Sequence, residues 1–212
     1  MISQAVSNID QAEQDLLKMG SMVESTMEKA IQALREQNAE LAIQVIEGDD
    51  RIDNLQLVIE EEIERVALTA PPRGFELRRD FAMIKIVNDL ERIGDYATNI
   101  AELVLELKHE QYLKPLIHIP QLAKLAMNMV STVLKSFIEK NADLAEAVCK
   151  KDDEADDLYE EIREELIKIT GQEADPRKAY QASRFLLIAE WRGDNIHPDR
   201  KKSEILTRRW IY

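Results

Sequence analysis

The middle of the chain contains a stretch whose side chains divide between two faces of one helix: Asn88-Asp89-Leu90-Glu91-Arg92-Ile93-Gly94-Asp95-Tyr96-Ala97-Thr98-Asn99-Ile100-Ala101-Glu102. At about 100° per residue, its aliphatic side chains share one broad face. The other face carries a line of oxygen-bearing side chains at steps of four, four and three residues: Glu91, Asp95, Asn99 and Glu102. Carboxylates four residues apart on a helix can reach one common object. The stretch therefore predicts a core helix with a candidate cation site on its outer side.

The residues alone leave two interpretations of that line open. Only Arg92 lies close in sequence to neutralise it, which favours a bound cation, whereas a solvated acidic face needs no ion. With 41 acidic residues in 212, pairs of acids four residues apart also arise by chance, so one pair is weak evidence. Recurrence of the pattern elsewhere in the chain strengthens the cation interpretation.

Composition favours an all-helical protein. The 212 residues can bury a core as one domain or as two domains of about 100 residues each. Hydrophobic residues make up 45% of the chain and charged residues 33%, while there are only six Gly and six Pro. Abundant Ala, Leu, Ile, Glu and Lys with so few helix breakers predict an all-α fold.

The charge balance narrows the function classes. A formal net charge of −13 argues against nucleic acid and against a basic surface for anionic membranes, and it favours cations or basic patches on other proteins. The single cysteine, Cys149, excludes an intrachain disulfide and suits a reducing compartment. Because no apolar run reaches about 18 residues and no signal peptide is apparent, we expect a cytoplasmic protein without direct membrane insertion.

Helical periodicity predicts three long helices in the first half of the chain, over residues 4–36, 38–68 and 76–109. Gly20 has no proline beside it, so the first helix is expected to continue through it. Asn38 is a candidate N-cap for the second helix. The breaker Thr69-Ala70-Pro71-Pro72-Arg73-Gly74 precedes the third, and Pro115 and Pro120 bracket a short connector. Short connections between long helices predict an antiparallel three-helix unit.

An internal repeat extends this unit to the whole chain. The segment Asn38-Ala39-Glu40-Leu41-Ala42 returns as Asn141-Ala142-Asp143-Leu144-Ala145, and the acidic segment 49–55 returns at 152–158, both at an offset of 103 residues. The pattern predicts two tandem antiparallel three-helix bundles, similar to spectrin repeats and related by internal duplication. We place the first bundle at residues 1–112 and the second at residues 113–212.

The second copy of the central motif is degenerate. The segment Glu190-Trp191-Arg192-Gly193-Asp194 keeps the spacing between the acid and Gly-Asp of the first motif. It begins about three residues earlier than the first motif does, relative to the helix before it. Three missing residues rotate the following side chains by about 60° around a helix. Pro198 stands where the first copy has Asn99, and proline is disfavoured in a helix interior. Residues 195–212 are basic and aromatic and unlike residues 96–109, so we expect a truncated or frame-shifted carboxyl end.

Two acid pairs on neighbouring helices form the candidate metal site. Asp49 and Asp53 lie on the second expected helix, and Glu91 and Asp95 lie on the third. Oxygen ligands without histidine suit a hard cation such as Mg²⁺, Ca²⁺, Mn²⁺ or ferric iron. Gly94, within the third helix, predicts close helix packing or ligand access, because glycine there costs about 1 kcal/mol relative to alanine.

Three motifs together resemble the PhoU family of phosphate-uptake regulators. They are Leu90 to Glu102 of the central stretch, Met19-Gly20-Ser21-Met22-Val23-Glu24, and Val45-Ile46-Glu47-Gly48-Asp49-Asp50-Arg51-Ile52-Asp53. The resemblance covers about residues 10–194. It implies two three-helix bundles side by side whose acidic motifs bind metal ions on a shared face.

The resemblance also implies site residues and partners. The metal positions of the family fall here on ten residues, the last four in the degenerate second copy: Asp49, Asp53, Glu91, Asp95, Asn99, Glu102, Asp152, Asp156, Glu190 and Asp194. The implied cofactors are divalent or trivalent metal ions. The implied partners are the ATPase of the phosphate ABC transporter and a sensor histidine kinase, and we expect a homodimer.

The function implied is negative regulation of phosphate uptake and of the phosphate-starvation response, by a non-enzymatic adaptor. Other interpretations of the sequence are an accessory protein of another phosphate or metal transporter, a metal-dependent hydrolase or oxidase on a helical bundle, and a structural helical module. No glycine-rich phosphate loop supports an enzyme, since all six glycines are isolated.

Overall fold

A computed structural model describes residues 2–173 and 175–195, with side chains for residues 9–173 and 175–190. Its helices are α1 (Ile2–Glu36), α2 (Ala39–Glu47), α3 (Asp50–Thr69), α4 (Phe75–Glu106), α5 (His118–Glu139), α6 (Ala142–Gln172) and α7 (Pro176–Asn195). Within these ranges there is no β-strand. The prediction of an all-α chain is confirmed.

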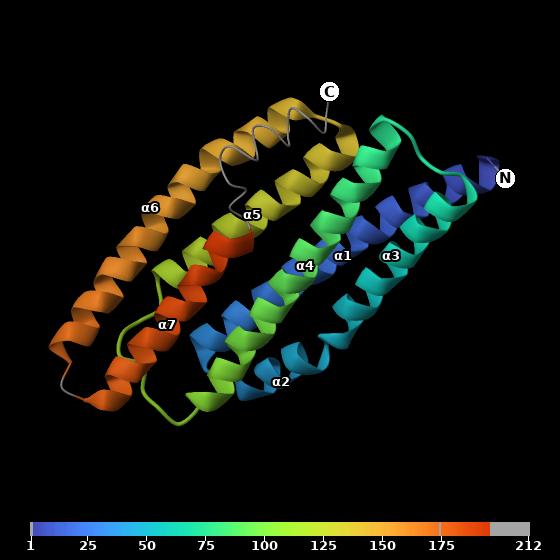
Figure 1. Cartoon of the computed structure of the whole chain (residues 1–212). Helices are drawn as coiled ribbons and strands as arrows, with labels where there is room; N and C mark the ends of the chain where they lie inside the picture. The colour runs from blue at the N-terminus through green and yellow to red at the C-terminus, as the bar shows by residue number, and fades with distance from the viewer. Residues whose placement is uncertain (1, 174, 196–212) are drawn as a thin grey trace.

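The helices form two bundles that lie side by side (Figure 1). In the first, α1 packs on α3 and α4, and the short α2 packs on α1 and α4. In the second, α6 packs on α5 and α7. Contacts of α1 with α5 and of α4 with α7 join the bundles. The predicted pair of antiparallel three-helix bundles is therefore confirmed.

Matching turns support the duplication. Gln37 and Lys140 have left-handed backbone angles, with φ of 51° and 53°, and each ends the first helix of its bundle. The next residues, Asn38 and Asn141, cap the second helices, and Asn38 accepts a hydrogen bond from the backbone N–H of Leu41 at 3.0 Å. These two pairs stand at the offset of 103 residues found in the sequence.

The expectation of one continuous helix over 38–68 is wrong. The chain breaks at Gly48 and Asp49, whose N–H groups donate to the carbonyls of Val45 and Ile46, three residues back. This tighter bonding separates α2 from α3. In the second bundle the segment that corresponds to α2 and α3 is the single helix α6, and Lys151 occupies the position of Gly48. Only the first bundle therefore begins a new helix beside its acidic pair.

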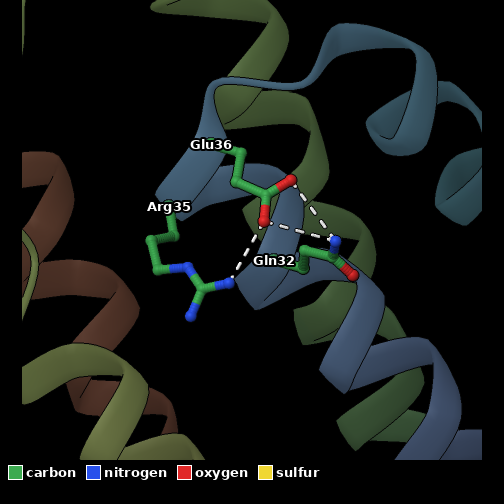
Figure 2. Close-up of polar contacts among 3 residues, drawn as sticks. All are labelled: Gln32, Arg35 and Glu36. Atoms are coloured by element: carbon green, nitrogen blue, oxygen red, sulfur yellow. Dashed lines mark hydrogen bonds and ion pairs between the residues drawn. The ribbon is translucent and has the colours of Figure 1, made fainter.

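The turn between α1 and α2 is fixed by local polar contacts. Figure 2 shows the Glu36 carboxylate accepting hydrogen bonds from Gln32, at 3.3 Å, and from Arg35, at 3.1 Å. The next side chain, Gln37, donates to the backbone carbonyls of Leu107 and Glu110. These carbonyls lie just after the last residue of α4, Glu106, so the turn is tied to the carboxyl end of that helix.

The connector between α4 and α5 is held to the second bundle. Leu113 N–H donates to Oε1 of the buried Gln181 at 2.6 Å, and the Tyr112 ring meets Phe185 edge-on at 5.3 Å. The predicted boundary at residues 112 and 113 lies in this connector and stays a prediction. The expected connector over 116–119 is wrong at its carboxyl end, because the segment between the helices covers residues 107–117 and α5 begins at His118. Pro120 then lies in the first turn of α5, where a missing N–H is tolerated.

Gly20 lies where α1 of the first bundle packs closely on α5 of the second. A Cβ atom placed there would overlap the Leu134 side chain on α5. We expect Gly20→Val to lower the free energy of unfolding by about 2 kcal/mol, as overpacked sites do, measured by urea denaturation. Ser21→Val adds the same side chain to an exposed neighbour on α1. If both variants lost equal stability, helix propensity and not the bundle contact would be the cause.

Candidate metal centre

Three carboxylates from two helices converge at the predicted site. Oxygen atoms of Asp49, Asp53 and Asp95 all lie within 4.8 Å of one another. Asp49 immediately precedes α3, Asp53 lies in its first turn, and Asp95 lies on α4. The structure therefore brings together three of the four acids in the two predicted pairs, and Glu91 is not among the three.

Close packing of α3 on α4 makes this convergence possible. Gly94 is buried against Ile52, and a Cβ atom at Gly94 would lie 3.1 Å from Ile52 Cδ1. Asp53 directly follows Ile52 in the sequence, and Asp95 directly follows Gly94. Of the two explanations that the sequence allows for Gly94, the structure shows close helix packing.

Burial and mutual repulsion disfavour the ionised form of these acids. Burial raises the pKa of Asp53, and the charges of Asp49, Asp95 and Asp50 raise it further. The pKa of Asp95 is raised by burial and then by Asp49. Like charges in proximity store electrostatic energy that a cation would release. The site is therefore arranged to favour a positively charged ligand.

Two oxygen atoms in the cluster lack a hydrogen-bond partner. Oδ1 of Asp49 and Oδ1 of Asp53 are both buried and unpaired. Asp49 holds the N-cap position of α3, yet its side chain makes no capping hydrogen bond. Buried carboxylate oxygens are costly without a partner, and carboxylates are the ligands that hard cations prefer. The residues present fit a Mg²⁺, Mn²⁺, Ca²⁺ or ferric ion.

The remaining predicted residues of the first bundle lie around this cluster. Glu91 borders it, since burial raises its pKa and the charges of Asp95, Asp53 and Asp49 add to that rise. Asn99 and Glu102 lie further along α4 with exposed side chains, and Glu102 is not among the converging carboxylates.

A neighbouring polar network was missed by sequence reasoning. Gln56 donates to Asn88 Oδ1 at 3.2 Å, and Asn88 donates to Glu60 Oε1 at 3.3 Å, joining α3 to α4 next to the acid cluster. Its signal was present, because Asp53, Gln56 and Glu60 follow one helix face at steps of three and four. The network fixes the register of the two helices beside the site.

Among its described side chains, the second bundle does not repeat this arrangement. Asp152 and Asp156 are partly buried on α6, while Glu190 is exposed on α7 and accepts a hydrogen bond from the Tyr159 hydroxyl at 3.4 Å. Among the described residues, the only converging group of three acids is the one in the first bundle. The side chain of Asp194 and all of residues 196–212, including Pro198, lie outside the described part of the chain.

The hydrogen bonds explain the difference in register. The offset of 103 residues pairs Tyr159 with Gln56, whose partner across the bundle is Asn88. Glu190 therefore occupies the place of Asn88, three residues before the place of Glu91. This agrees with the early arrival of the second motif in the sequence.

Comparisons with known proteins identify the family. Residues 16–104 and residues 119–190 each match the PhoU domain. The chain belongs to the PhoU family. The family resemblance found in the sequence is thus confirmed, and each match falls on one of the two bundles.

Curated PhoU relatives cover most of the chain. A "Phosphate-specific transport system accessory protein PhoU homolog" of Aquifex aeolicus (strain VF5) is 37% identical over 181 residues, 85% of this chain and 81% of the relative. The PhoU protein of Escherichia coli (strain K12), another phosphate-specific transport system accessory protein, is 32% identical over 152 residues, 72% of this chain and 63% of the relative.

Solved PhoU structures share the fold. The crystal structure of PhoU from Pseudomonas aeruginosa superposes with a TM-score of 0.84 at 29% identity, covering 96% of this chain and 98% of that chain. The phosphate transport system regulatory protein PhoU from Streptococcus pneumoniae gives 0.82 at 26% identity, covering 96% of each. Among the described helices of this PhoU-family chain, none has an apolar stretch that would cross a bilayer.

The raised pKa values predict how stability depends on pH without metal. Since the pKa of Asp53 is higher in the folded chain than in the unfolded one, ionisation above about pH 4 costs folding free energy. We expect Asp53→Asn to match the wild type near pH 3 and to exceed its free energy of unfolding by about 0.5 kcal/mol at pH 7. Urea denaturation in chelator checks this.

Asp10→Asn is the control for that experiment, because Asp10 is exposed on α1 and is not a member of the cluster. It should leave the free energy of unfolding unchanged across the same pH range. A stability difference for Asp53→Asn that is constant with pH would contradict the assignment of repulsion to this site.

Proposed function

We propose that this protein is a metal-binding, non-enzymatic regulator of phosphate uptake that acts in the cytoplasm. It represses the phosphate-starvation response by linking the ATPase of a phosphate ABC transporter to a sensor histidine kinase. Support for the transport context comes from relatives named as accessory proteins of phosphate-specific transport systems and from one solved relative named as regulatory.

The observation that carries the metal-binding part is the convergence of Asp49, Asp53 and Asp95 around two unpaired buried oxygens. No histidine joins this group. A hard divalent or trivalent cation fits this ligand set and a structural zinc does not. The site stands at the seam of α3 and α4 on the outside of the first bundle, where a bound ion would also be accessible to a partner.

Charge supplies the proposed mechanism. Without a bound metal ion, several carboxylates lie close together where α3 meets α4, in a chain whose net charge is already −13. A bound cation would neutralise part of this group, and like-charge repulsion against an acidic partner would fall accordingly. Metal occupancy would thereby set whether the transporter ATPase or the kinase can dock.

Removing the ligands tests the metal site. Asp53→Ala combined with Asp95→Ala should abolish Mn²⁺ binding while leaving helicity intact, because two of the three converging carboxylates are lost. Isothermal titration calorimetry and elemental analysis measure the binding, and circular dichroism measures the helicity. The charge reversals Glu91→Lys and Asp95→Lys should act in the same way.

The second bundle offers a matched control. Asp152→Ala with Asp156→Ala also removes two carboxylates, from the positions on α6 that correspond to Asp49 and Asp53 at the offset of 103 residues. This variant should keep Mn²⁺ binding at the first bundle. Equal loss of Mn²⁺ in both double variants, or in neither, would refute the site assignment.

A reporter for a phosphate-starvation promoter tests the regulatory role. In cells lacking their own PhoU relative, the wild-type chain should restore repression in high phosphate, and the Asp53→Ala and Asp95→Ala variant should not. Full repression by this variant at equal protein level would separate metal binding from regulation and contradict the proposed mechanism.

A further inference from the structure

A groove follows the contact between α1 and α5, where the first bundle meets the second. Its volume is about 340 Å³, which is within the usual range of ligand pockets in proteins. All of its lining residues belong to these two helices, so the groove is separate from the acid cluster of α3 and α4. We define the α1–α5 groove by Leu17, Gly20, Ser21 and Glu24 of α1 and by seven residues of α5 from Met127 to Glu139.

The inside of the groove is apolar. Its most deeply buried large side chains are Met127 and Leu134, each 5% exposed, and Leu134 lies directly against Gly20. Leu17 is 42% exposed on the α1 side, and Ile138 is partly buried on the α5 side. Large apolar side chains that remain accessible around a hollow mark interaction sites. The groove therefore offers apolar surface that a bound molecule would cover.

The length of the groove fits a helix. On α5, Met127, Val130, Leu134 and Ile138 follow at steps of three, four and four, so they share one face of that helix. The lining from Met127 to Glu139 extends over about 18 Å, or somewhat more than three helical turns. An amphipathic helix that docks in a groove anchors side chains at i, i+3 or i+4, and i+7, over a similar length.

The charges that line the groove favour a basic occupant. They are two acids, Glu24 and Glu139, and one base, Lys135, which sum to −1 in a chain of net charge −13. Glu24 makes no ion pair or hydrogen bond with another described side chain. Glu139 lies 3.9 Å from Lys135, and both are exposed, so this pair is weak. Because α1 and α5 run in opposite directions (Figure 1), Glu24 and Glu139 lie at opposite ends of the groove.

We propose that the α1–α5 groove binds a basic amphipathic helix of a partner protein. The apolar stripe of that helix covers Met127 and Leu134, and a Lys or Arg side chain at each end of the stripe meets Glu24 or Glu139. Complementary charges at the two ends set the position of the helix and speed its association. The site needs no metal ion, because every group that it uses lies on α1 or α5.

Two synthetic peptides test the occupant. Each has about 18 residues with leucines at i, i+4, i+7 and i+11, and the first carries an arginine at each end of this stripe. Fluorescence anisotropy should show that the arginine peptide binds the full chain, equally well in chelator and in Mn²⁺. The second peptide, with glutamate in place of each arginine, should bind at least tenfold more weakly.

Charge reversal at the groove should exchange this preference. Glu24→Lys with Glu139→Lys should raise the dissociation constant of the arginine peptide at least tenfold and lower that of the glutamate peptide. Glu61→Lys with Glu64→Lys makes the same change of net charge at exposed positions of α3, and it should keep the preference for the arginine peptide. Equal weakening in the two double variants would refute the groove as the binding site. Circular dichroism of each variant identifies any loss of fold.

Methionine methyl resonances locate the peptide on the unaltered chain. The arginine peptide should shift the resonance of Met127 more than that of Met129, which is fully buried on the opposite face of α5. Binding that leaves Met127 unshifted, equal binding of both peptides, or no binding of either would overturn the proposal. A Met127 shift that grows with the concentration of the chain alone would identify a second copy as the occupant and would also refute a basic partner helix.

Discussion

The contact between Gly94 and Ile52 is the constraint on which the first bundle and its candidate site depend. A larger residue at position 94 would require the Ile52 side chain to shift, because a Cβ there already comes within 3.1 Å of Ile52 Cδ1. At this short separation, Asp53 and Asp95 have to share the same small volume at the seam. Close packing of the core and crowding of the carboxylates are thus two results of one contact.

Repulsion among the crowded carboxylates lowers the stability of the contact between α3 and α4, and the rest of the bundle must offset this cost. Three carboxylates with two unpaired buried oxygens repel one another, and the direction of the pKa changes of Asp53 and Asp95 shows that ionisation is resisted. The buried stripes of α1, α3 and α4 form a continuous apolar core that can tolerate this cost. Sites that break a rule of stability in this way are typical of function.

The sequence was sufficient for most of the helices, for the duplication and for the approach of Asp49 and Asp53 to Asp95, because periodicity and repeat offset carry that information. It was insufficient for the break at Gly48, where regular helix and tighter turn differ by little energy. It was also insufficient for the pairing of Gln56 with Asn88, since amide partners across helices depend on tertiary register. Local patterns therefore define elements, and packing defines which polar groups meet.

Comparison of the two bundles shows how little separates a site from a plain acidic surface. Both bundles keep an acidic pair between their first and third long helices. In the second bundle, however, this segment is the single continuous helix α6. The acid on the opposite helix, Glu190, lies about one helical turn before the position that corresponds to Glu91. Asp152 and Asp156 accordingly have no third carboxylate converging with them among the described side chains. Among the described side chains, helix register and not acid content therefore makes the difference, and the converging cluster found there lies on the first bundle.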